Sequence, residues 1–104
     1  MDNLESKKQL SKLASDNKFV LIDFSAVWCG PCVKLAPVID DLAKDLTAIK
    51  FVKADIEGLD DLATEYSVEA VPTLVLLKDG KEVARLEGAL GKSALKTWLT
   101  EQTA

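Results

Sequence analysis

Two short apolar runs constrain the fold of this chain more than any other feature. Residues 19–24 and 73–77 are almost continuously apolar, and polar or turn-forming residues bound each run. A strand with this composition is buried on both faces, whereas a strand with one wet face alternates between apolar and polar residues. The rest of the chain must therefore supply helices that cover both sides of a sheet.

Four segments with apolar residues at helical spacing supply that cover. A further apolar segment at 49–56 and a more polar one at 82–87, which follows the turn sequence Lys78-Asp79-Gly80-Lys81, complete the sheet. Helices and strands alternate in the first part of the chain, and a hairpin follows near its end. This order predicts an α/β fold, with a mixed sheet of four to five strands and four helices on its two faces. The residues that define the helices are Leu10, Leu13 and Ala14; Cys32, Leu35, Ala36, Ile39, Leu42, Ala43 and Leu46; Leu59, Leu62, Ala63 and Tyr66; and Leu95, Trp98 and Leu99.

The length and charge of the chain limit its organisation and its partners. Its 104 residues suit one domain over 1–104, since no repeat or linker-like stretch divides them. The net charge of -4 offers no basic surface for nucleic acid or an anionic membrane. No apolar run approaches the roughly 20 residues of a membrane span. The first residues lack the basic-then-apolar order of a signal peptide, so we expect a cytoplasmic protein.

The two cysteines, Cys29 and Cys32, are separated by two residues at the junction of a predicted strand and a predicted helix. A disulfide that closes so short a loop stabilises a fold by roughly 2 kcal/mol at best in the chain-entropy model. A zinc site needs two further ligands, and the chain has no histidine and no other cysteine. The pattern therefore favours thiol redox chemistry over a structural disulfide or a metal site.

The place of each cysteine relative to the helix predicts its role. Cys29 precedes the helix, where unpaired backbone N–H groups and the helix dipole stabilise a thiolate. Cys32 lies one turn further on and is expected to be more buried. We therefore predict that Cys29 attacks a disulfide and that Cys32 resolves the mixed disulfide. Gly30 allows close backbone approach, and Pro31 suits the first helical turn.

Residues 23–32, with the sequence Asp-Phe-Ser-Ala-Val-Trp-Cys-Gly-Pro-Cys, resemble the active-site segment of the thioredoxin family. Residues 71–73 resemble the proline loop of that family, and residues 78–80 and 87–89 match its later landmarks. The resemblance extends in register over nearly the whole chain and is closest to cytosolic eukaryotic members. It implies the thioredoxin fold and the activity of a protein-disulfide reductase.

The resemblance also implies the partners of the chain. These would be disulfide-containing substrate proteins and an NADPH-dependent thioredoxin reductase, and the protein would act as a monomer. The chain itself has no nucleotide-binding motif and is expected to carry no cofactor and no metal. Gly30-Pro31 is similar to the reductases, whereas isomerases of this fold usually carry Gly-His. An oxidase or isomerase, and a binding module with incidental redox chemistry, remain the alternatives.

Asp23 interrupts the first apolar run. A strand aspartate is usually solvated, but the neighbouring Ile22 and Phe24 favour burial, which raises the pKa of a carboxyl group. By resemblance, Asp23 is the acid that deprotonates the Cys32 thiol. Lys53 matches the lysine that pairs with this acid in the family, and a solvated lysine is the alternative interpretation.

An apolar surface around Cys29 is a further implication of the resemblance. The backbone of Val71 would pair there with an extended substrate segment. X–Pro bonds are mostly trans, yet the family places a cis proline at Pro72. Val33 is a departure, because many members carry lysine or arginine at that position, whereas here Lys34 follows one place later. The residues of the predicted surface are Trp28, Gly30, Pro31, Val71, Pro72, Gly88 and Ala89.

Overall fold

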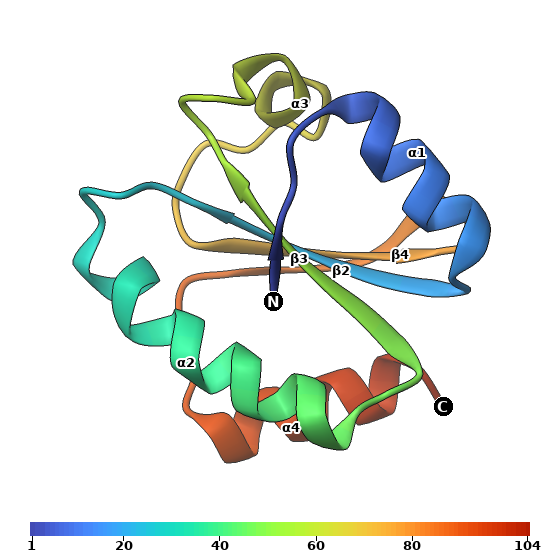
Figure 1. Ribbon diagram of the computed structural model, residues 1–104. Helices are drawn as coiled ribbons and strands as arrows, with labels where there is room; N and C mark the ends of the chain where they lie inside the picture. Colours follow the sequence, from blue (N-terminus) through green and yellow to red (C-terminus); the bar gives the residue numbers. More distant parts are fainter.

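The computed structural model describes residues 1–104. It shows a five-stranded mixed sheet with helices on both faces (Figure 1). The predicted architecture is thereby confirmed. The predicted strands and the hairpin lie within one residue of their expected positions. The elements are β1 (Asp2–Asn3), α1 (Lys7–Asp16), β2 (Phe19–Ser25), α2 (Gly30–Asp45), β3 (Ile49–Asp55), α3 (Asp60–Glu65), β4 (Thr73–Lys78), β5 (Lys81–Glu87) and α4 (Lys92–Gln102).

The two strongly apolar strands lie inside the sheet, whose order is β1-β3-β2-β4-β5. The central strand β2 pairs in parallel with β3 and antiparallel with β4. Every residue of β2 is buried, and so is every residue of β4 except Lys78. The more polar strands β1 and β5 form the edges, where one side of the backbone faces water.

The predicted hairpin joins β4 to β5 through Asp79 and Gly80. Lys78 pairs with Lys81 across the turn. The φ angles of Asp79 and Gly80 are 52° and 82°. Positive φ at both central residues is what a two-residue type I′ turn requires, and Asp-Gly is among its preferred sequences. The turn therefore sets the strand register next to the hairpin, and the register shifts between Leu76 and Leu77 for the rest of the pair.

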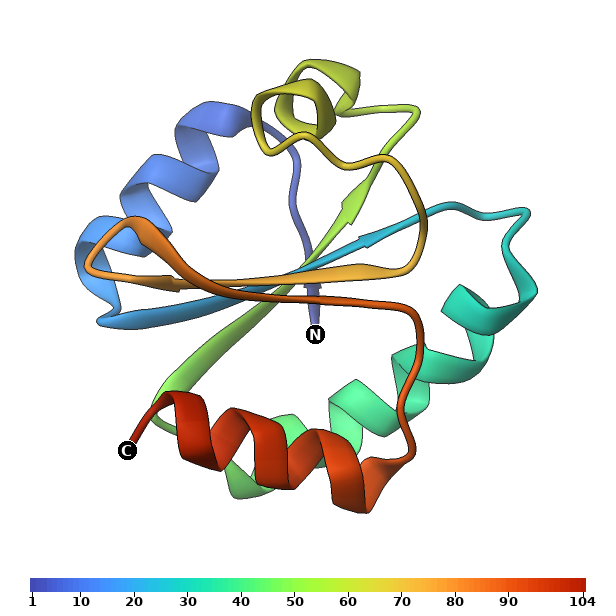
Figure 2. The same ribbon diagram turned by 180° about the vertical axis from the view of Figure 1, so that it is seen from behind.

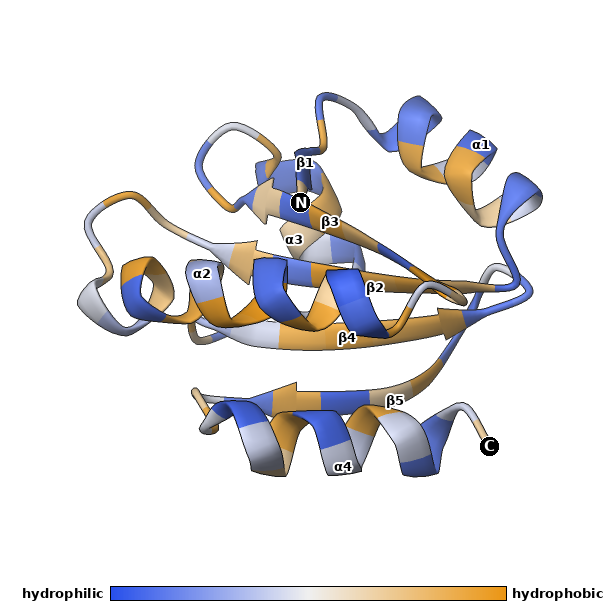
Figure 3. Ribbon diagram, turned by 60° about the horizontal axis from the view of Figure 1, so that its bottom comes forward, coloured by the Kyte–Doolittle hydropathy of each residue, from blue (hydrophilic) through white to orange (hydrophobic).

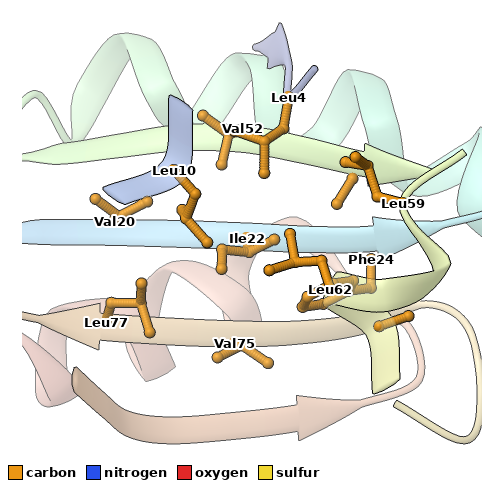
Figure 4. Packing of buried hydrophobic residues seen from close by; sticks show 12 residues of the cluster. Leu4, Leu10, Val20, Ile22, Phe24, Val52, Leu59, Leu62, Val75 and Leu77 are labelled. Carbon is orange, nitrogen blue, oxygen red and sulfur yellow. The ribbon is translucent and has the colours of Figure 1, made fainter. Parts of the chain in front are cut away.

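Side-chain alternation along β2 divides the core into two clusters. Val20, Ile22 and Phe24 contact the cluster under α1 and α3, shown in Figure 4. Phe19 and Leu21 contact the cluster under α2 and α4. Figures 1 and 2 show these helix pairs on opposite sides of the sheet. Each fully buried side chain of this size contributes about 1.5–3 kcal/mol of transfer free energy.

Two details differ from the sequence pattern. The short strand β1 has no apolar run, and it forms because its backbone pairs in parallel with β3. Trp98 is half-buried and packs against the cluster beneath α4, whereas Leu95 and Leu99 lie fully within it. No helix of the chain is both long and apolar enough to span a membrane.

The packing of α2 on the sheet yields a stability prediction. Ile39 has no exposed surface, so Ile39→Ala leaves a cavity and should cost about 2–5 kcal/mol in the free energy of unfolding. Val33, on the same helix, is 59% exposed, and Val33→Ala should change the free energy of unfolding by less than about 0.5 kcal/mol. Urea denaturation measures both values. Equal losses in the two variants would contradict the predicted orientation of α2.

Candidate active site

Cys29 caps the N-terminus of α2. Its backbone is extended, with φ -89° and ψ 110°, and the helix begins at Gly30 with a proline in its first turn. The backbone N–H of Cys32 points to the Cys29 sulfur, and the N and Sγ atoms are 3.2 Å apart. The sulfur therefore lies where free N–H groups and the positive end of a 16-residue helix stabilise negative charge.

The two cysteines are close enough to form a disulfide. Their Cα atoms are 5.3 Å apart, within the usual range for such a bond. Cys29 is 6% exposed and Cys32 only 2%, so Cys32 is the more buried of the two, as its position predicts. The Cys29 sulfur also lies 3.8 Å from the carbonyl oxygen of Val71. The proline loop therefore reaches the redox pair.

Asp23 is buried with neither carboxylate oxygen hydrogen-bonded to protein. Along β2 it shares its face with Phe19 and Leu21, which lie beneath α2, the helix that carries Cys32. Burial raises the pKa of Asp23 to about 6, and the positive charge of Lys53 partly opposes this shift. A carboxyl group that titrates near neutral pH can exchange protons with a thiol.

Lys53 lies beside Asp23 in the sheet. The two residues pair in register between the parallel strands β2 and β3, so their side chains leave the same face. No ion pair joins them directly, since both Asp23 oxygens lack a partner. The half-buried Lys53 side chain lines a cavity of about 340 Å³ with Asn3 and Val27 among its other lining residues. Lys53 therefore acts on Asp23 through its charge at longer range.

The proline loop and the loop after β5 are hydrogen-bonded to each other. The Val71–Pro72 peptide bond is cis, as the resemblance implies. The N–H of Gly88 donates to the carbonyl oxygen of Pro72 at 2.9 Å. Gly88 has a φ of 87°, which favours glycine at this position. Pro72 itself is buried, while Gly88 and Ala89 are exposed beside it.

Trp28 lies on the surface next to Cys29. It is 66% exposed, and its Nε1–H donates to Glu57 Oε1 at 2.9 Å. On the other side of the cysteines, Gly30, Pro31 and Ala89 line a common groove. The structure therefore brings the predicted surface residues together around Cys29, with Val71 half-buried and Pro72 beneath the surface.

Comparison with known proteins identifies the family. The Thioredoxin family model matches residues 2–101. An H-type thioredoxin of Fagopyrum esculentum is 44% identical over 85 residues, which are 82% of this chain and 73% of that protein. The chain belongs to the thioredoxin family. A thioredoxin of Mycoplasmoides gallisepticum is 36% identical over 99 residues, covering 95% of this chain and 99% of that protein.

Solved thioredoxin structures share the fold. The X-ray structure of Fasciola hepatica thioredoxin has a TM-score of 0.91 and 40% identity, covering 98% of this chain and 99% of that one. A Plasmodium falciparum thioredoxin has a TM-score of 0.91 and 31% identity, covering 97% and 98%. Thioredoxins are disulfide oxidoreductases, and the Cys29–Cys32 pair, spaced as Cys-Gly-Pro-Cys, is the redox pair of this chain.

Two residues near the site were not among the predicted ones. Glu57 fixes the Trp28 ring, and no sequence signal links residues 29 positions apart. Ser25 is 1% exposed, and its hydroxyl has no protein partner. Two positions after Asp23, Ser25 lies on the same face of β2, so strand alternation could have placed it beside the buried acid.

The burial of Asp23 predicts a pH-dependent stability. Its pKa rises from 3.8 to about 6, so the native protein binds more protons than the unfolded chain between these values. The free energy of unfolding must therefore fall as pH rises through this window, by about 3 kcal/mol in total. Asp23→Asn cannot titrate, so its stability relative to wild type should rise from pH 4 to pH 8 and exceed wild type at pH 8.

Urea denaturation of the oxidised proteins at pH 4, 6 and 8 measures this difference. Glu101→Gln removes an exposed carboxylate at the end of α4 and serves as the matched control, since a surface substitution of this kind should change the free energy of unfolding by less than about 0.5 kcal/mol. A constant or falling advantage of Asp23→Asn between pH 4 and pH 8 would contradict the desolvation of this carboxyl group.

Proposed function

We propose that the protein reduces disulfides of other proteins, with Cys29 as the attacking residue and Cys32 as the resolving residue. The observation that carries this assignment is the Cys29 sulfur at the N-terminus of α2, in contact with the loop of Val71. Cys32 is 2% exposed, so its sulfur is accessible to Cys29 but not to a folded substrate. The order of attack follows from this difference in access.

The first step forms a mixed disulfide. The Cys29 thiolate attacks one sulfur of the substrate disulfide, so a bond between Cys29 and the substrate forms while the substrate S–S bond breaks. The departing substrate sulfur leaves as a thiolate and takes a proton from water. Backbone N–H groups at the start of α2 stabilise the Cys29 thiolate before the attack.

The second step releases the substrate. The carboxylate of Asp23 takes the proton of the Cys32 thiol, and the Cys32 thiolate attacks the Cys29 sulfur. The Cys29–Cys32 disulfide forms, the mixed disulfide breaks, and the second substrate sulfur leaves as a thiolate. Two electrons have then passed from the cysteine pair to the substrate. The pKa of Asp23, raised to about 6 by burial, suits this transfer near neutral pH, and Lys53 moderates the shift.

The surface around Cys29 would hold the substrate. Val71 precedes β4, and its backbone offers hydrogen bonds to an extended substrate segment, as in strand addition. The exposed Trp28, Pro31 and Ala89 surround this position with apolar surface, and Gly30 and Gly88 allow a close approach. Pro72, buried beneath, holds the loop beside the cysteines.

Family membership supports a proposal for the cellular setting. Thioredoxins act on protein disulfides and are reduced by thioredoxin reductase. We propose that an NADPH-dependent reductase of this kind returns the two electrons to Cys29 and Cys32, that the protein works as a monomer in the cytoplasm, and that it thereby serves electron transport and redox homeostasis there. The chain binds no cofactor in this proposal.

Reduction of insulin by dithiothreitol tests the role of Cys29. Cys29→Ser removes the attacking sulfur, so turnover should fall to the uncatalysed rate. Val83→Ser, an exposed substitution on β5, should retain the wild-type rate. Undiminished turnover by Cys29→Ser would contradict the proposal.

Release of the substrate tests Asp23. Without its proton acceptor, Cys32 should attack more slowly, and at pH 7 the mixed disulfide should decay of the order of 10²-fold more slowly in Asp23→Asn than in wild type. Quenching with acid followed by mass spectrometry measures the decay. Equal decay rates at pH 7 would show that Asp23 does not take this proton.

A further inference from the structure

Cross-helix ion pairs join α2 to α4. Asp45 Oδ2 lies 3.7 Å from Lys96 Nζ, and Asp41 Oδ2 lies 3.9 Å from Lys92 Nζ. In both pairs the acid belongs to α2 and the cation to α4. Figure 3 shows the two helices beside each other on one face of the sheet. The paired acids define the stripe of α2 that faces α4.

This stripe continues toward the cysteines through Val38 and Lys34. Residues 34, 38, 41 and 45 are spaced by four, three and four positions, which places them along one side of the helix. The ion pairs stop at Asp41, because α4 begins only at Lys92. Beyond that point, the loop of Ala89 and Leu90 faces α2 in place of the helix.

A groove of about 380 Å³ lies at this end of the stripe. Pro31 and Val38 of α2 form one wall, and Ala89 and Leu90 form the other. Leu90 is 37% exposed, although it is a large apolar residue. The groove adjoins Gly30, next to Cys29, so a substrate bound at the cysteine pair can reach it.

Lys34 is the only charged residue that lines the groove. Its side chain forms no ion pair. Lys92 and Lys96 lie further along the contact between α2 and α4, which we call the seam, and both form ion pairs. The residues opposite Lys34 in the groove, Ala89 and Leu90, offer no carboxylate. The seam therefore ends in an apolar groove with an unpaired cation at its edge.

We propose that this groove is a specificity site for the substrates of the redox pair. It takes an apolar side chain near the substrate disulfide, and Lys34 binds an adjacent carboxylate. The inference rests on the proposed function, since the substrate must reach Cys29. Its occupant is a peptide segment with an apolar residue next to an acidic residue. The apolar walls exclude water from one side of the ion pair and so strengthen it.

Short disulfide peptides provide the probe. One capped peptide carries Leu-Glu after its cysteine, in the order Cys-Gly-Leu-Glu, and a second carries the reversed order, Glu-Leu-Gly-Cys. Each is used as a disulfide-linked dimer, and in two companions glutamine or lysine replaces glutamate. The second-order rate constant for reduction by pre-reduced protein is measured for each peptide.

Wild type should reduce the glutamate peptide about 2- to 5-fold faster than the glutamine peptide in at least one order, the range expected for an exposed ion pair. Lys34→Gln should abolish this preference, and Lys34→Glu should favour the lysine peptide. Lys96→Gln removes a lysine from the same seam outside the groove and should keep the wild-type preference. Salt near 1 M should weaken the preference in wild type.

The apolar wall is tested separately. Leu90→Ser should slow both the glutamate and the glutamine peptide, and it should slow the glutamate peptide more, because the wall that strengthens the ion pair is lost. Val83→Ser, which changes an exposed apolar residue outside the groove, should slow neither peptide.

An equal ratio of glutamate to glutamine rates in wild type and Lys34→Gln, in both peptide orders, would overturn the inference. So would an unchanged rate with Leu90→Ser. Failure of the proposed function has a different signature: wild type would then reduce every peptide no faster than Cys29→Ser does.

Discussion

Burial of the central strand on both faces is the constraint on which the rest of the structure depends. Every residue of β2 is buried, so helices must cover both sides of the sheet. One of these helices is α2, which begins at Gly30 after a short loop that follows Ser25, the last residue of β2. That start places Cys29 at a helix N-terminus. The same burial encloses Asp23, whose carboxyl group has no hydrogen bond to protein. Thiolate stabilisation and the raised pKa of the acid thus share one structural cause.

Much of this arrangement could be predicted from local patterns. The apolar runs located β2 and β4, Asp79-Gly80 located the hairpin, and the residues beside Asp23 indicated its burial. Backbone pairing between distant segments has no such signal, which is why the polar strand β1 and the contact of Trp28 with Glu57 were not predicted. The cis bond before Pro72 came from the family resemblance, because no nearby residue type indicates it.

The groove beside Lys34 depends both on the sequence of α2 and on the position of α4 in the fold. The spacing of α2 residues defines a stripe, which can be read from the sequence. Whether a residue of that stripe finds an ion partner depends on where α4 begins, and α4 begins after the loop that faces Lys34. In the proposal made above, one helix boundary and one lysine set the substrate preference, while the cysteines and the buried acid keep their geometry.

The central claim is that burial raises the pKa of the Asp23 carboxyl group to about 6, so that the group titrates close to neutral pH. NMR titration of its carboxyl carbon in the oxidised protein tests this claim most directly, because the chemical shift reports the protonation of this one group. The account predicts a midpoint near pH 6, the pKa to which burial raises Asp23. A midpoint near 3.8, the ordinary value for an aspartate, would show that the carboxyl group is solvated and would contradict the account.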